Sequence, residues 1–411
     1  NFYGQTDLPE GLSEVMSISA GKHHNLALKS DRTVIAWGRN DYTEGSVPLD
    51  LSNVILIEAG GHHNLVLKTD GSLVAWGANW YGQINIPNGL EVMMPDEVYG
   101  CDQSDYYVSP NGSNYNDGLS ESSAFKTIGF AIYMACGEYS NPINIHLSAG
   151  IYSSSVTGEI FPINMESGIN LIGAGEDVTI LDSENESNIL IFEFVEGVSV
   201  EKLSIINGNA STSTWLGGGI YINESEYLSF NNININNCYA SKGGGIYSKN
   251  SNPNFNLMTI SNNIAENGYG GGVFLLNSNA IMTNIDVVGN SGCWLGCGIS
   301  LESSSPYLDN LNISDNWSDE GAGNGAGFFA GSQSNPTIIN SNFSNNYAAN
   351  FSGGGVRIQE SDATLINILI NGNSARSGSG ISLQNSNSTT RNTEQKLAVM
   401  RPPRPRHHDG S

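Results

Sequence analysis

The side chains best suited to acid–base chemistry are the carboxylates, and the sequence brings few of them together. A glycosidase needs two carboxyl groups roughly 5 to 9.5 Å apart. Once the chain is aligned on a repeat of about 26 residues, Asp286 stacks between Thr259 and Asn312, without a second carboxylate in its column. Asp315 likewise stacks between two uncharged residues. The other acidic pairs lie on turns five repeats apart: Glu224 with Glu226, and Glu360 with Asp362. No catalytic residue is predicted.

A polysaccharide lyase would instead need a calcium-binding carboxylate cluster beside a basic side chain. The basic residues of the regular repeats have no acidic cluster in register: Lys242, Lys249, Arg357 and Arg376. Cleavage of a polysaccharide therefore remains the second interpretation of the function.

Metal chemistry has two weak starting points. The pairs His23-His24 and His62-His63 lie 39 residues apart, and they are better explained as strand positions of a repeat, packed beside Trp37 and Trp76. Cys293 and Cys297 have no histidine beside them, and their spacing alone is a weak metal signal. The sequence leaves open the disulfide pairing of Cys293 with Cys297 and of Cys101 with Cys136. No metal site and no cofactor is predicted.

These residues are carried by a repeat that dominates the second half of the chain. A glycine-rich cluster followed by an apolar residue recurs seven times, and its last glycines are 26, 27, 26, 29, 28 and 25 residues apart. The residues after each cluster alternate, as in Ile220-Tyr221-Ile222, which is typical of a half-buried strand. Such a period predicts the coils of a parallel β-helix, with glycines at tight corners.

Two columns of this β-helix are predicted to matter. An asparagine follows an apolar residue by three positions in most copies and is expected to form an inward ladder of amides. Its members are Asn209, Cys238, Asn263, Asn290, Asn316, Asn346 and Asn373. The column that points outward after the glycines is expected either to stabilise neighbouring coils or to bind a glycan or protein as an exposed strip. Its members include Tyr221, Tyr247, Phe274, Phe329 and Arg357.

The repeat resembles those of known surface proteins. Gly353-Gly354-Gly355-Val356 and Phe343-Ser344-Asn345-Asn346 resemble the repeats of chlamydial polymorphic outer membrane proteins, over roughly residues 200–388. Residues 107–128 resemble the N-terminal segment of pectin-lyase-like β-helix proteins. These resemblances imply a right-handed parallel β-helix of about ten coils over residues 105–388. A capping helix is expected over residues 126–136.

The first 92 residues follow a different period. Gly21-Lys22-His23-His24-Asn25-Leu26 recurs 39 residues later, as does Ala36-Trp37-Gly38. Strand-sized runs between turns favour one four-stranded propeller blade per repeat. The motifs resemble RCC1-type repeats in their short bacterial form. This implies two to three blades of an incomplete propeller and a protein that extends upstream.

The expected organisation is therefore blades over 1–92, a linker over 93–104, the β-helix over 105–388 and a tail over 389–411. That tail holds five of the 16 basic residues and no readable strand, so it is expected to be disordered or artificial. A tail that binds membranes or polyanions is the alternative.

The charge and hydropathy of the chain exclude some classes of function. The net charge of −24 would repel phosphate backbones, so nucleic acid is excluded as a partner. No apolar run approaches 18 residues, so no membrane-spanning segment is expected. The favoured function is a non-catalytic, secreted or bacterial cell-surface protein that recognises a glycan or a protein, as in adhesion. A structural spacer is the third interpretation. The sequence leaves the oligomeric state open.

Overall fold

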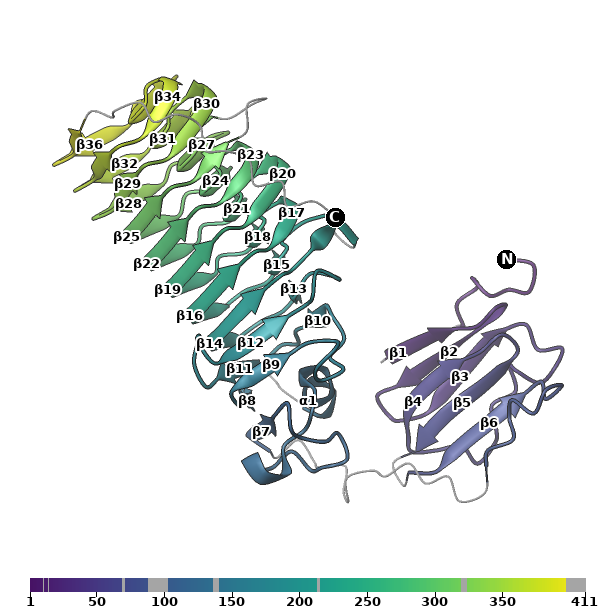
Figure 1. The fold of residues 1–411 in the computed structure, drawn as a ribbon. Helices are drawn as coiled ribbons and strands as arrows, with labels where there is room; N and C mark the ends of the chain where they lie inside the picture. Colours follow the sequence, from purple (N-terminus) through teal and green to yellow (C-terminus); the bar gives the residue numbers. More distant parts are fainter. Residues whose placement is uncertain are drawn as a thin grey trace. The chain divides into compact units, whose positions relative to one another are not determined.

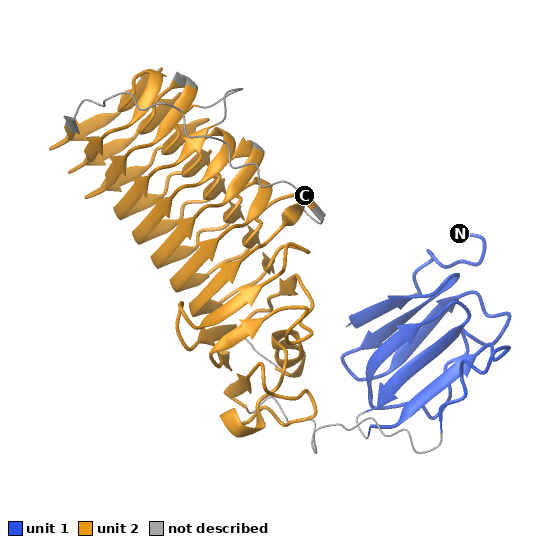
Figure 2. Cartoon of the chain, in the orientation of Figure 1, with its two compact units in different colours: residues 1–100 blue, residues 101–411 orange. Residues whose placement is uncertain are grey.

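A computed structural model describes residues 1–9, 11–13, 15–68, 71–87, 103–135, 140–212, 215–318 and 324–396. The chain divides into two compact units, residues 1–100 and 101–411 (Figure 2). The protein is all-β, with about 3% helix, as the strand patterns predict. Most of the expected linker, residues 93–102, lies outside the described residues.

In the first unit, two antiparallel three-stranded sheets follow the 39-residue period. The first blade consists of β1 (Val15–Ala20), β2 (His24–Lys29) and β3 (Val34–Gly38). The second blade consists of β4 (Val54–Ala59), β5 (His63–Lys68) and β6 (Leu73–Gly77). Four strands per blade were expected, whereas the described residues form three. In the loop after β3, Asn40 Oδ1 accepts a hydrogen bond from the Gly45 amide at 2.9 Å.

The second unit begins with a cap. Strand β7 (Asp105–Val108) adds to the first edge of the β-helix, and a 3₁₀ turn (Glu121–Ser123) leads to helix α1 (Ile128–Met134). Thr127 is the N-cap of α1, and the buried Glu159 carboxylate accepts hydrogen bonds from Ile128 N and Gly129 N at 2.6 and 3.0 Å. The helix is shorter than the expected 126–136, and residue 136 lies outside the described residues.

Parallel strands then stack from coil to coil, so that the sheets run along one axis (Figure 1). The long sheet has sixteen strands, β7 among them. Its others are β8 (Ile143–Leu147), β9 (Gly150–Tyr152), β11 (Ile169–Gly173), β12 (Thr179–Asp182), β14 (Ser199–Ile206), β16 (Ser229–Asn236), β19 (Asn254–Ser261), β22 (Ile281–Val288), β25 (Tyr307–Ser314), β28 (Thr337–Ile339), β29 (Asn342–Ser344), β32 (Thr364–Ile366), β33 (Leu369–Asn371), β36 (Thr389–Arg391) and β37 (Glu394–Lys396).

The short sheet has nine strands, which sets about nine turns of the β-helix. They are β10 (Ile163–Asn164), β13 (Leu190–Glu193), β15 (Ile220–Asn223), β18 (Ile246–Lys249), β21 (Val273–Leu276), β24 (Ile299–Glu302), β27 (Phe328–Gly331), β31 (Val356–Gln359) and β35 (Ile381–Gln384). Two three-stranded sheets form the third side: β17 (Tyr239–Lys242), β20 (Ile264–Tyr269) and β23 (Ser291–Leu295), then β26 (Trp317–Ser318), β30 (Tyr347–Ser352) and β34 (Ser374–Ser377).

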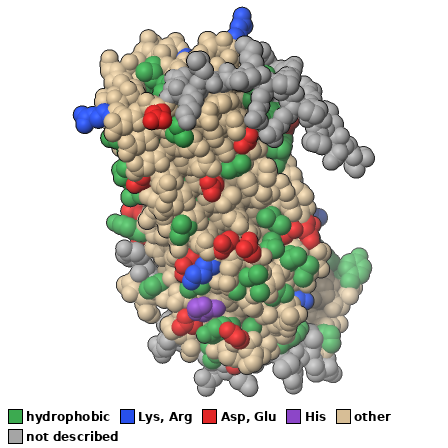
Figure 3. All heavy atoms as spheres, turned by 60° about the vertical axis from the view of Figure 1, so that its left-hand side comes forward, with side chains coloured by type: hydrophobic (Ala, Val, Ile, Leu, Met, Phe, Trp, Pro, Cys, Tyr) green, Lys and Arg blue, Asp and Glu red, His purple; other side chains and the backbone are tan. Residues whose placement is uncertain are grey.

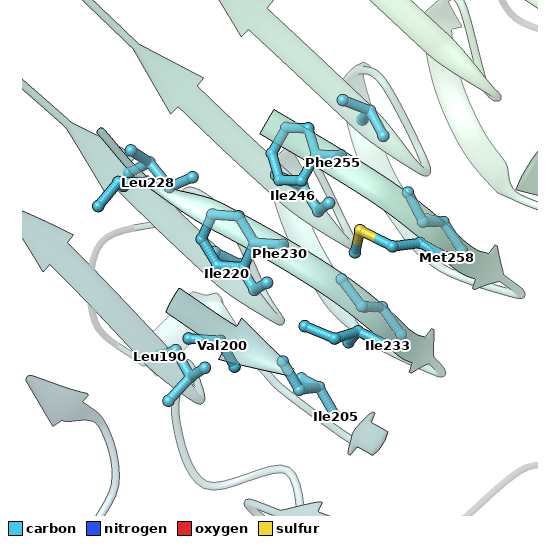
Figure 4. Close-up of a cluster of buried hydrophobic side chains, with 14 of the residues drawn as sticks. Leu190, Val200, Ile205, Ile220, Leu228, Phe230, Ile233, Ile246, Phe255 and Met258 are labelled. Atoms are coloured by element: carbon cyan, nitrogen blue, oxygen red, sulfur yellow. The ribbon is translucent and has the colours of Figure 1, made fainter. Parts of the chain in front are cut away.

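The core is a set of apolar columns between the long and short sheets. Ile220 and Ile246 of the short sheet face Phe230 and Phe255 of the long sheet in Figure 4, and all four are buried. Each column continues in register from coil to coil, for example from Phe230 to Phe255. Alternation places every second side chain inside, so the core follows from the sequence pattern.

Glycine is required at the corner before each strand of the short sheet. Gly217 has φ of +61°, a region that side-chain-bearing residues rarely adopt. At Gly272, a Cβ atom would lie 2.7 Å from the carbonyl oxygen of Gly298 in the next coil. The corners therefore select glycine for conformation and for close backbone approach.

The β-helix does not stop at residue 388. Strands β36 and β37 pair with β32 and β33, so residues 389–396 begin another turn and the expected tail boundary is wrong there. The inward column changes from Leu365 to Thr390, and hydrophobic alternation could not reveal a strand without apolar residues. Residues 397–411, the rest of the expected tail, lie outside the described residues.

Candidate functional site

The predicted amide ladder is present at the corner between the long sheet and the third side. Asn290 Oδ1 accepts from the backbone N and Nδ2 of Asn263, at 2.9 and 3.0 Å. Asn290 Nδ2 donates to Ile260 O and to Asn316 Oδ1, at 2.9 and 3.0 Å. The pattern continues through Asn346 to Asn373, and the five ladder asparagines are buried. The ladder satisfies corner amides that water cannot reach.

Two expected members behave differently. Asn209 lies one position past the ladder, because it pairs with Tyr239 and leaves Gly208 in register with Cys238. The Asn209 side chain instead accepts from Ser211 N at 3.0 Å. Cys238 does occupy the ladder position, where its backbone N donates to Asn263 Oδ1 at 2.9 Å. Burial raises the pKa of the Cys238 thiol to about 12, so it is an inert packing group.

Extending the ladder by one residue should stabilise the protein. In Cys238→Asn, the new amide would donate to Asn263 Oδ1 and to Ile205 O. Asn263 makes the equivalent hydrogen bonds in the next coil, to Asn290 Oδ1 and Ile235 O. We expect the free energy of unfolding to rise by about 1 kcal/mol, measured by chemical denaturation. Cys238→Ala serves as the control without new hydrogen bonds. Lower stability for Cys238→Asn than for Cys238→Ala would show that the position rejects an amide.

A serine ladder forms at the corner between the short and long sheets. Ser251 Oγ accepts from Ser225 N at 2.9 Å, and Ser278 Oγ accepts from Ser251 N at 3.2 Å. Each hydroxyl donates within its own turn, as from Ser251 Oγ to Lys249 O at 2.8 Å. The ladder also includes Ser334, which lies 30 residues after Ser304. Both hydroxyl functions are used, so these serines are structural rather than nucleophilic.

The outward aromatic column stacks but is not an exposed strip. The rings of Tyr221 and Tyr247 are 5.5 Å apart and nearly parallel, at 4°. Tyr247, Phe274 and Phe329 retain only 4%, 1% and 7% of their exposure, so the expected accessibility is wrong for them. Burial also raises the pKa of Tyr247 to about 12. A ligand-binding role for this column stays a prediction that its burial disfavours.

The third side of the β-helix explains this burial. Tyr269 of β20 stacks on Phe274 with centroids 5.7 Å apart. Lys242 of β17 places Nζ 5.4 Å from the centre of the Phe274 ring. At the far end of the column, Arg357 is 9% exposed and donates from Nη1 to Ser382 Oγ at 2.6 Å. Strand alternation predicts which side chains leave the core, but not which are covered by a neighbouring strand.

One histidine of each pair lies near the other pair, since the His23 and His62 ring centroids are 6.1 Å apart. His24 is buried and its Nε2 lies 2.8 Å from Asn64 Oδ1 in the other blade. His62 packs against Tyr42 and Trp80, and burial lowers its pKa. Within the described ranges, no group of three or more His, Cys, Asp or Glu side chains is arranged to hold a metal ion.

An open groove on the outer face of the long sheet is a candidate for ligand binding. It has a volume of about 750 Å³ and crosses four coils. Its lining residues are Asn284, Ile285, Asp286, Asn310, Leu311, Asn312, Asn340, Ser341, Asn342, Asn367 and Leu369. The groove follows a bend in the strands, where Asn284 and Asn310 adopt φ of +56° and +58°. Asparagine tolerates this left-handed conformation better than most residues.

Two rows of amides form the floor of the groove. In the bend row, Asn310 Nδ2 donates to Asn284 Oδ1 at 2.8 Å. In the second row, Asn312 Nδ2 donates to Asp286 Oδ1 and Asn342 Nδ2 to Asn312 Oδ1, both at 3.0 Å. These bonds fix the side chains but use only part of each amide, which has two N–H donors and an oxygen with two lone pairs.

The charge of the groove limits its chemistry. Asp286 is its one ionisable lining residue. It stands opposite Asn312, and Asp309 stands opposite Thr283, so neither carboxylate faces another across these strands. Sequence reasoning predicted the register of Asp286 but missed the groove. The recurrence of Asn at 284, 310, 340 and 367 was a usable signal that was hidden by the high asparagine content.

The structure also settles one cysteine question. Cys293 and Cys297 form a disulfide with a Cα–Cα distance of 5.3 Å. It links strand β23 to the glycine corner that follows this strand. Cys101 and Cys136 lie outside the described residues. Among the residues that the structure describes, no helix has the length and apolarity needed to cross a bilayer.

Comparisons with known proteins agree with this architecture. Residues 167–351 match the right handed beta helix region, and residues 15–44 and 54–83 match the regulator of chromosome condensation (RCC1) repeat. No curated protein matches the chain. The resemblance to polymorphic outer membrane proteins stays a prediction.

Several solved structures are similar at low identity. A pectin methylesterase from carrot has a TM-score of 0.37 at 10% identity, over 75% of this chain and 87% of that one. Pectin methylesterase PemA from Erwinia chrysanthemi scores 0.33 at 10% identity, over 72% and 90%. The mannuronan C-5 epimerase AlgE4 A-module from Azotobacter vinelandii scores 0.28 at 13% identity, over 63% and 90%. At these scores no functional argument follows, and the family matches carry the conclusion: the chain joins a pair of RCC1 repeats to a right-handed parallel β-helix.

Proposed function

We propose that the β-helix unit is a non-catalytic recognition module that binds a neutral, hydroxyl-rich glycan in the amide groove of the long sheet. The observation that carries this proposal is the pair of amide rows on the groove floor. A sugar hydroxyl both donates and accepts hydrogen bonds, and so does each amide. Because the coil-to-coil bonds already fix these side chains, little conformational freedom is lost on binding.

Charge supports a neutral ligand over a polyuronate. No Lys or Arg lines the groove, whose single ionisable residue is Asp286. The whole chain carries −24, so an acidic polysaccharide would be repelled over the surface as well. Figure 3 shows a surface dominated by uncharged side chains and backbone, with scattered acidic groups.

A secreted or outer cell-surface location, with a role in adhesion, is part of the proposal. The Cys293–Cys297 disulfide supports it, because disulfides persist mainly in oxidising compartments. The exterior, which is rich in amide and hydroxyl side chains, is compatible with contact to a hydrated glycan layer.

The test is direct binding of the 411-residue chain to neutral glucans, mannans and galactans, with pectate and alginate as acidic competitors. Asn312→Ala removes bonds in both directions along the second row and should weaken binding of a neutral glycan about tenfold. Asn234→Ala is the matched control, because Asn234 holds the same column three coils earlier, outside the groove. Its binding should be unchanged.

Reducing and unsaturated ends are measured in the same samples. Retained glycan without product is the expected result. Turnover that is lost in Asp286→Asn would replace the proposal with a hydrolase or lyase. Binding to a protein but to no glycan, or tighter binding to pectate than to every neutral glycan, would contradict it as well.

A further inference from the structure

A second groove, the corner groove, runs along the corner between the long sheet and the third side. It has a volume of about 390 Å³ and spans four coils, from Asn185 to Ile264. The amide groove of the long sheet begins only at Asn284, so the two grooves share no residue. Because neighbouring coils lie about 4.8 Å apart, the corner groove is roughly 14 Å long. That length suits a short oligomer.

One wall of the corner groove carries asparagines in the left-handed conformation. Asn185, Asn237 and Asn262 have φ of +65°, +56° and +55°, and all three residues are exposed. Among the residues that the structure describes, none forms a hydrogen bond with these three side-chain amides. Each amide therefore keeps two N–H donors and a carbonyl oxygen for a ligand.

The opposite wall is apolar and is anchored by the third side of the β-helix. Tyr239 and Ile264 are the first residues of β17 and β20 and pair in register. Tyr239 N donates to Gly208 O at 2.7 Å, and Ile264 N donates to Cys238 O at 2.8 Å. Tyr239 is half-buried and Ile264 is 39% exposed. The sheet thus fixes the backbone of this wall, while a tyrosine offers an apolar ring with a polar tip.

The corner groove is built by particular residues, because neither wall continues into the next coil. Gly289 follows Asn262 in the asparagine column, and Ser291 follows Ile264 in the apolar column. Ser291 is buried. The groove is therefore not a general feature of the stacked coils.

The lining of the corner groove favours a neutral ligand. It contains no Lys, Arg, Asp or Glu. Glu184 and Glu186 flank Asn185 in the sequence. Glu184 Oε2 accepts a hydrogen bond from Ser155 N at 3.2 Å. Glu186 Oε2 accepts one from Ser154 Oγ at 2.8 Å. These two carboxylates are held beside another loop, and their charge disfavours an acidic ligand.

We propose that the corner groove is a second carbohydrate-binding site, which takes a short neutral oligosaccharide. A sugar ring has an apolar C–H face and a rim of hydroxyl groups. The C–H face packs on the ring of Tyr239, and the hydroxyls exchange hydrogen bonds with the amides of Asn237 and Asn262.

Two sites on one chain have a consequence for function. Because the grooves share no residue, one chain would hold two glycan segments at once and so join separate polysaccharide chains. This bridging rests on the function proposed for the amide groove of the long sheet, whereas the corner site itself does not.

The test is titration calorimetry and saturation-transfer NMR of the full chain with neutral tri- and tetrasaccharides of glucose, mannose and galactose. Asn262→Gly removes one amide and keeps the backbone, since its φ of +55° suits glycine and Gly289 already holds the equivalent position. We expect binding to weaken about fivefold. Asn345→Gly is the matched control, with φ of +56° in the same column but outside both grooves. Its binding should be unchanged.

The stacking contact is tested by a pair of changes at Tyr239. Tyr239→Ala should weaken binding roughly tenfold and abolish saturation transfer to the ring C–H protons of the sugar. Tyr239→Phe keeps the ring and should retain most of the binding. Circular dichroism verifies the fold, and Asn262→Gly decides alone if Tyr239→Ala does not fold.

Repeating these measurements in the Asn312→Ala background separates the two grooves. Loss of binding in Asn262→Gly, with full binding in Asn312→Ala, would support the corner site and contradict the function proposed for the long-sheet groove. A wild type that binds none of these oligosaccharides would overturn the corner site. So would binding that Asn262→Gly and Tyr239→Ala both retain in full, or an equal loss in Asn345→Gly.

Discussion

Asn290→Ala should lower the free energy of unfolding of the β-helix by about 4 kcal/mol, because several buried polar groups lose their partner at once. The backbone N and Nδ2 of Asn263 would lose their shared acceptor. Ile260 O would lose its donor from the ladder. Each buried group left without a partner costs about 1–3 kcal/mol.

The measurement is chemical denaturation followed by far-ultraviolet circular dichroism, with hydrogen exchange to locate the loosened coils. Asn310→Ala is the matched control, since Asn310 also bonds from coil to coil but lies exposed in the groove. We expect it to cost about 1 kcal/mol, because an exposed hydrogen bond is lost and alanine tolerates the φ of +58° less well than asparagine. Equal losses for the two variants would mean that burial of the ladder contributes nothing.

Phe274→Ala should cost about 3 kcal/mol of stability and leave glycan binding unchanged. Phe274 is 1% exposed and lies between Tyr247 and Tyr269, so its removal opens a cavity on the outer side of the short sheet. Tyr307→Ala on β25 is the control, because Tyr307 is 42% exposed and its loss should change stability by only about 0.5 kcal/mol.

Thermal denaturation and glycan binding are measured on the same samples. If Phe274→Ala keeps its stability but loses binding, the aromatic column is a recognition surface after all. The groove proposal would then have to be abandoned in its favour.

The sequence allowed the coils and the inward ladder to be predicted because both recur at a fixed spacing. Asn290 and Asn316 follow their apolar partners by three positions, which places them past the end of the strand, at the corner where they are buried. Asn209 has the same spacing, yet the local pairing moves the ladder position to Gly208. Periodicity therefore predicts the column, and only the backbone register predicts its members at an irregular coil.

What could not be predicted depends on contacts between segments far apart in the chain. The cover that Tyr269 and Lys242 place on Phe274 comes from a different strand, and no pattern around residue 274 encodes it. Strand β36 was not predicted because Thr390 occupies a position where earlier coils have an apolar residue. The groove was not predicted because its asparagines resemble the rest of an asparagine-rich surface.

The direction of the ladder bonds has an electrical consequence. In each step, Nδ2 donates toward the following coil and Oδ1 accepts from the preceding one, from Asn263 through to Asn373. The side-chain dipoles therefore add along the axis, whereas the backbone dipoles of a sheet largely alternate. Bonds in such a chain polarise one another. The β-helix thus has a polar axis at its corner, with its positive end at Asn373.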